Sequence, residues 1–163
     1  MYEAQKNAAA LIVFQRRMEE NQKPLPEILK KSMKAIEQQT LSTVSKIFDP
    51  EKTCGHTNCS IKTLRNLCSE QNVSTSILEQ MDKLVEKYQS VISKETRDKR
   101  LAHMDYESMQ EETVYTIEFE PLLGLIEDLC ELVSAVSREV MTGEITFPKM
   151  TKLVSQLENG FSF

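Results

Sequence analysis

A group of reactive polar residues lies between positions 94 and 106, directly after a long amphipathic pattern. Arg97 precedes His103, one of only two histidines in the chain, by six residues, and Asp98 lies between them. Imidazole titrates near neutral pH and can move a proton, and a planar guanidinium binds phosphate oxygens well. Such residues suit phosphodiester cleavage, in which His103 exchanges a proton with a ribose hydroxyl or a leaving oxygen while Arg97 holds the phosphate.

The spacing of Arg97 and His103 restricts how they can act together. On a straight helix they would lie about 120° apart around the axis and roughly 9 Å apart along it, so they could not share one phosphate. Either the backbone leaves the helix between them, or a second copy of the chain brings its own pair across a symmetric interface. The plain alternative is that Arg97 forms surface ion pairs with Asp98, Glu95 or Asp105 and that His103 is an ordinary residue at a helix end.

Apolar residues recur at three- and four-residue steps along most of the chain, which predicts helices. The pattern stops at the Pro24/Pro26 pair, at Asp49-Pro50 and at Gly143, and Ser60 is suited to cap a short helix. We expect a polar loop from Glu51 to Cys59. The expected helices cover residues 8–18, 26–47, 60–68, 77–92, 122–140 and 149–157.

Composition supports an all-α fold. The 163 residues include only 4 Gly and 5 Pro and no Trp, and 40% are hydrophobic, enough for one core. We therefore expect one domain over residues 1–163, a single bundle of about five to six helices. No apolar run approaches the length of a membrane span, and the N-terminus lacks a secretory pattern, so we expect a cytoplasmic protein with reduced cysteines and no membrane partner.

Charge is distributed unevenly. Nine acidic residues and no Lys or Arg lie between Met104 and Ser137, so the rest of the chain carries +4 against −5 for the whole. Such runs usually form a solvated face. Next to a basic site, this stretch is also a candidate surface for a basic antitoxin protein, or a screen against RNA.

The segment from Arg97 to Asp105 resembles the abortive-infection branch of the HEPN superfamily, whose ribonucleases carry Arg, then Asn or Asp, then His a few residues later. Two upstream segments also resemble the family: Ile47-Phe48-Asp49-Pro50 is similar to the end of its upstream helix, and Ser60-Ile61-Lys62-Thr63-Leu64 to its short third helix. The resemblance spans most of residues 30 to 140. It implies a HEPN-like helical bundle that dimerises through the signature region.

Related enzymes cut single-stranded RNA without a metal or other cofactor, using the ribose 2′-hydroxyl as nucleophile. The resemblance implies that His103 is the acid/base or phosphate-orienting group, that Arg97 anchors the phosphate and that Asp98 positions one of them. We place RNA contacts on the neighbouring residues Lys94, Lys99, Arg100 and Tyr106. Asp98 stands where Asn is common in the family. Some members have lost cleavage and act as RNA-binding or protein-interaction modules, which is the alternative function.

Two other constellations compete with this interpretation. Cys54, His56, Cys59 and Cys68 supply enough ligands for a structural zinc, although the spacing is unusual and Cys68 lies on an apolar face with Leu64 and Leu67. Cys130, Met81, Met104 and Met109 are expected in the core. Glu127, Asp128 and Glu131 are the nearest approach to the carboxylates of a metal-dependent helical phosphohydrolase, but no partner pair is evident and a solvated face explains them better.

Overall fold

The computed structural model describes residues 1–21, 26–92, 119–140 and 145–160 of the chain. In these residues the chain forms six α-helices and one two-stranded antiparallel hairpin, which confirms the all-α prediction. In chain order, the elements are α1 (Tyr2–Asn21), α2 (Glu27–Ile47), β1 (Lys52–Thr53), β2 (His56–Thr57), α3 (Ile61–Glu70), α4 (Thr75–Val91), α7 (Phe119–Val140) and α8 (Met150–Gly160).

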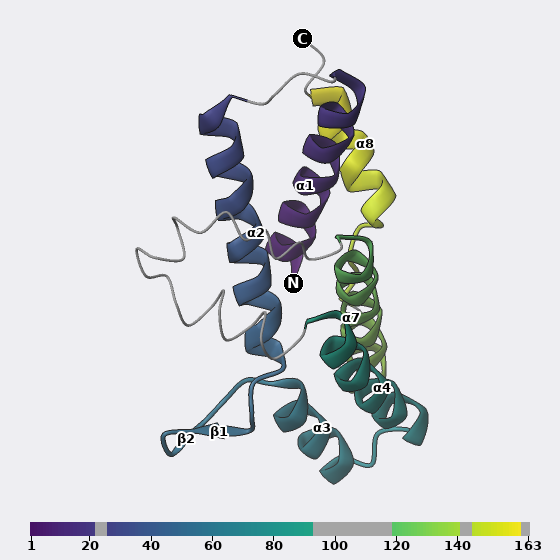
Figure 1. The fold of residues 1–163 in the computed structure, drawn as a ribbon. Helices are drawn as coiled ribbons and strands as arrows, with labels where there is room; N and C mark the ends of the chain where they lie inside the picture. The colour runs from purple at the N-terminus through teal and green to yellow at the C-terminus, as the bar shows by residue number, and fades with distance from the viewer. Residues whose placement is uncertain (22–25, 93–118, 141–144, 161–163) are drawn as a thin grey trace.

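Helix α1 is the centre of one half of the bundle, where it contacts α2, α7 and α8 (Figure 1). Helix α8 runs beside α1 in the same direction. Gln5 Nε2 donates to the carbonyl oxygen of Pro148 (3.2 Å) near one end, and Arg16 pairs with Glu158 (2.9 Å) near the other. Ala8 and Ala9 on α1 are buried, and their small side chains allow the neighbouring helices to come close.

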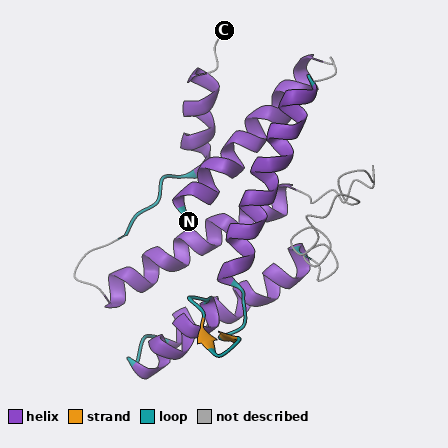
Figure 2. Cartoon of the chain, turned by 90° about the vertical axis from the view of Figure 1, so that its left-hand side faces the viewer, coloured by secondary structure: helices purple, strands orange, loops and turns teal. Residues whose placement is uncertain are grey.

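Helices α4 and α7 form an antiparallel pair in the other half, with α3 packed against α4 (Figures 1 and 2). Ser74, just before α4, bonds to Glu139 at the end of α7, and Lys87 near the end of α4 pairs with Asp128 in the middle of α7. Because partners later in α4 lie earlier in α7, the two helices run in opposite directions. The end of α4 and the start of α7 therefore lie at the same end of the pair.

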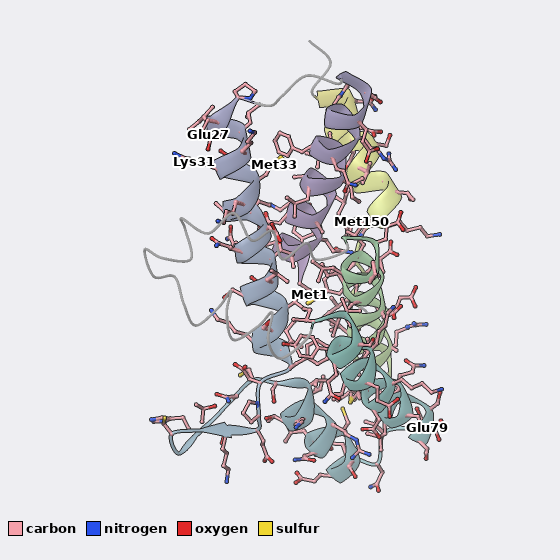
Figure 3. The ribbon with its side chains drawn as sticks, in the orientation of Figure 1. Met1, Glu27, Lys31, Met33, Glu79 and Met150 are labelled. Atoms are coloured by element: carbon pink, nitrogen blue, oxygen red, sulfur yellow. The ribbon has the colours of Figure 1, made fainter. Side chains whose placement is uncertain are left out.

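The apolar stripes read from the sequence form the core. Met81 on α4 and Cys130 on α7 are buried, as predicted. Figure 3 shows Met33 directed from α2 toward α1, while Glu27 and Lys31 point away from the bundle. The largest side chains with almost no exposed surface come from four helices: Gln5, Leu11, Thr40, Val44, Met81, Leu122, Leu125, Ile126 and Leu129.

Helix α3 has well-defined ends. Ser60 caps it as predicted, because its Oγ accepts the backbone N–H of Thr63 (3.4 Å). At the other end Asn72 has φ +56°, and Val73 N–H donates to the carbonyl of Cys68 (3.0 Å), a Schellman arrangement that turns the chain sharply toward α4. Leu67, expected on the apolar side of this helix, is 53% exposed.

The segment from Glu51 to Cys59 was expected to be a loop but contains the β1–β2 hairpin. Lys52 pairs with Thr57 and Thr53 with His56. Cys54 (φ +50°) and Gly55 (φ +83°) form the two-residue turn, whose positive φ values match the primed turns of tight hairpins. Asn58 Nδ2 donates to the carbonyl of Pro50 (2.6 Å) and secures the base of the hairpin.

Among the described helices, none combines the length and the apolar character that a membrane crossing requires.

Candidate functional site

Ile92 is the last described residue before position 93 and Phe119 the first after it, and both lie at the same end of the α4–α7 pair. Helix α4 ends at Val91, and Ile92 is buried with an extended backbone (φ −119°, ψ +97°) while its N–H still bonds to the carbonyl of Tyr88 (2.8 Å). The sequence predicted a helix over residues 77–92 that runs toward Arg97, and the observed end at Val91 agrees with it; the polar cluster itself lies outside the described residues.

Helix α2 is fixed to the same end of α4. The rings of Phe48 and Tyr88 stack in parallel, with centroids 4.1 Å apart and an interplanar angle of 5°. The Tyr88 hydroxyl also bonds to Ser45 Oγ (3.1 Å), and all three side chains are buried. The buried stack and the satisfied hydroxyl join the end of α2 to the end of α4, close to Ile92.

All seven predicted site residues lie outside the described part of the chain. These residues are Lys94, Arg97, Asp98, Lys99, Arg100, His103 and Tyr106. The structure therefore establishes only the elements before and after them: the end of α4, packed against α2, and the start of α7. Met104, Met109 and the acidic residues from 105 to 118 also lie outside the described residues.

The part of the acidic stretch on α7 is described. Glu120, Glu127 and Glu131 are exposed to solvent, and Asp128 pairs with Lys87 of α4. Lys87 lies across Gly124, where an added Cβ would come 3.3 Å from its Nζ. On this helix the carboxylates form a solvated face with one ion pair between helices, as the simpler interpretation predicted.

The structure does not gather Cys54, His56, Cys59 and Cys68 into a metal site. Cys54 lies at the tip of the hairpin and Cys59 beyond its base, both exposed, whereas Cys68 is buried in the core. Within the described residues no three His, Cys, Asp or Glu side chains are close enough to hold a metal ion.

Burial favours the protonated thiol form at Cys68 and Cys130. Burial raises the pKa of the Cys130 thiol to about 11, and the pKa of Cys68 is raised by burial and by the nearby Glu139 carboxylate. A thiolate, not a thiol, is the nucleophile and the metal ligand, so both residues serve packing.

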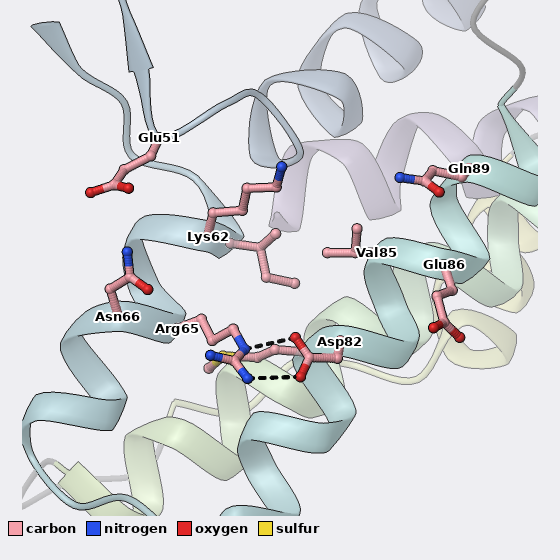
Figure 4. A pocket seen from close by; sticks show the side chains of 10 residues that line it. Glu51, Lys62, Arg65, Asn66, Asp82, Val85, Glu86 and Gln89 are labelled. Carbon is pink, nitrogen blue, oxygen red and sulfur yellow. Dashed lines mark hydrogen bonds and ion pairs between the residues drawn. The ribbon is translucent and has the colours of Figure 1, made fainter.

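A cleft that sequence reasoning missed lies between α3 and α4, below the base of the hairpin (Figure 4). It is open to solvent and has a volume of about 670 Å³. Arg65 on α3 and Asp82 on α4 form a two-point ion pair at its edge, with Nε–Oδ1 at 2.7 Å and Nη2–Oδ2 at 2.9 Å. This pair lowers the pKa of Asp82 and raises that of Arg65.

The sequence shows the cleft residues only as the polar sides of two amphipathic helices. Their meeting depends on how α3 packs against α4, which no residue pattern encodes, so no signal in the sequence could have located the cleft. Figure 4 places Lys62 and Asn66 on the α3 wall and Val85, Glu86 and Gln89 on the α4 wall.

Comparison with known proteins supports one assignment. No curated protein and no solved structure matches the chain. A family model does match: the HEPN domain of AbiU2, over residues 14–156, which extend from α1 into α8 and include the signature segment. The match covers most of the chain, and its all-α bundle agrees with the fold, so the chain belongs to the AbiU2 family of abortive-infection HEPN domains.

Proposed function

We propose that the chain is a metal-independent endoribonuclease that cuts single-stranded RNA, with Arg97, Asp98 and His103 as its catalytic residues. The observation that carries the proposal is the Arg97-Asp98 and His103 signature inside a chain of the AbiU2 HEPN family. The buried contact between Tyr88 and the end of α2 supports it, because a catalytic segment needs a packed base from which to be positioned.

In the proposed reaction, the ribose 2′-oxygen attacks the adjacent phosphorus and the bond from phosphorus to the 5′-oxygen breaks. His103 accepts the 2′-hydroxyl proton while water protonates the departing 5′-oxygen, or His103 in its charged form protonates that oxygen while water takes the 2′-hydroxyl proton. Arg97 stabilises the negative charge on the phosphoryl oxygens. The products are a 2′,3′-cyclic phosphate and a 5′-hydroxyl, so no external reactant is consumed.

We further propose that residues 1–163 act as one domain and that two copies form a homodimer around a shared groove. An antitoxin protein that binds the acidic stretch from Met104 to Ser137 completes the proposal, because a nuclease of this kind would otherwise harm its host. Expression of His103→Ala, which should not be toxic, followed by identification of a protein that copurifies in fixed ratio, tests for such a partner.

The direct test of the activity uses the two histidines as a matched pair. Purified chain is incubated with labelled single-stranded RNA in the presence of a chelator, and His103→Ala is compared with His56→Ala, which alters the exposed histidine of the hairpin. We expect His103→Ala to slow cleavage by about 10²- to 10⁴-fold and His56→Ala to leave it unchanged.

Equal cleavage by His103→Ala and the wild-type chain would remove His103 from the mechanism. Absence of cleavage by the wild-type chain on any RNA would favour the second function, a non-catalytic RNA-binding or protein-interaction module. Asp98 favours this alternative, because it directly follows Arg97 in the sequence and its negative charge would oppose phosphate binding.

A further inference from the structure

We draw no further inference here: the strongest candidate, the exposed surface patch on the first half of α2 with Ile28, Lys31 and Lys34, carries nothing because the described part of the structure does not show what covers it.

Discussion

The four cysteines form two classes, which makes their reactivity a direct test of the packing. Cys54 and Cys59 are exposed on the hairpin segment, whereas Cys68 and Cys130 are 3% and 4% exposed. We expect two thiols of the native chain to react rapidly with a disulfide reagent at pH 8 and the other two to react at least about tenfold more slowly, since burial limits access and raises their pKa values.

The measurement is the time course of released chromophore in buffer, compared with four rapid thiols in denaturant. A Cys54→Ser/Cys59→Ser double variant should show no fast phase in the native state. A third fast thiol in the wild-type chain would mean that the core around α3 or α7 opens readily, contrary to the described packing.

The candidate catalytic residues and the cleft differ in how far sequence alone could identify them. Arg97, Asp98 and His103 were selected because their chemistry and order match a known signature, which requires no coordinates. The alternative prediction of a zinc site was wrong, because Cys54 lies at the tip of the hairpin, Cys59 lies beyond its base and Cys68 is buried in the core. Long-range packing decides such questions, and it is not encoded in local spacing.

The N-terminus of α4 is capped by a residue of α7, which is far from it in the sequence. Ser74 precedes α4, and its own side chain makes no capping bond. Instead Glu139, in the last turn of α7, accepts from the Ser74 backbone N–H (2.5 Å) and from its hydroxyl (2.9 Å). A carboxylate at a helix N-terminus satisfies a free N–H group and also interacts favourably with the helix dipole.

Glu139→Ala should therefore lower the free energy of unfolding by about 0.5–2 kcal/mol, the range measured for lost helix caps, and lower Tm by roughly 1–8 °C. Glu131→Ala is the control, because Glu131 lies on the same helix, is exposed and has no side-chain partner among the described residues. Thermal unfolding followed by circular dichroism is the measurement. Identical melting of the two variants would show that the cap contributes nothing.

Helices were predictable where an apolar stripe and clear stop signals coincide. The prediction for α2 ended at Asp49-Pro50 and that for α7 ended before Gly143, and both agree with the structure to within a few residues. The hairpin was missed because its strands have two residues each and its turn uses Cys54 where Asn or Asp is usual. The Glu139 cap joins residues 65 positions apart, beyond any local pattern.

The architecture of the whole molecule explains why a second copy is part of the proposal. Helix α4 ends at Val91, before the signature residues, and on any straight helix Arg97 and His103 would diverge by about 120°. A two-fold axis next to the signature segment would let each chain supply part of a shared site. Two inactive variants can then complement each other in a mixed dimer, which is impossible if both residues act within one chain.

Mixing the two inactive variants Arg97→Ala and His103→Ala should restore cleavage if each site combines Arg97 of one chain with His103 of the other. Random exchange makes half of the dimers mixed, and each mixed dimer contains one intact site of two, so about a quarter of wild-type activity should return. If both residues act within one chain, every site in the mixture lacks a group and activity stays at the level of the separate variants. Light scattering at the assay concentration confirms that dimers are present, and a strictly monomeric but active wild-type chain would contradict the shared groove.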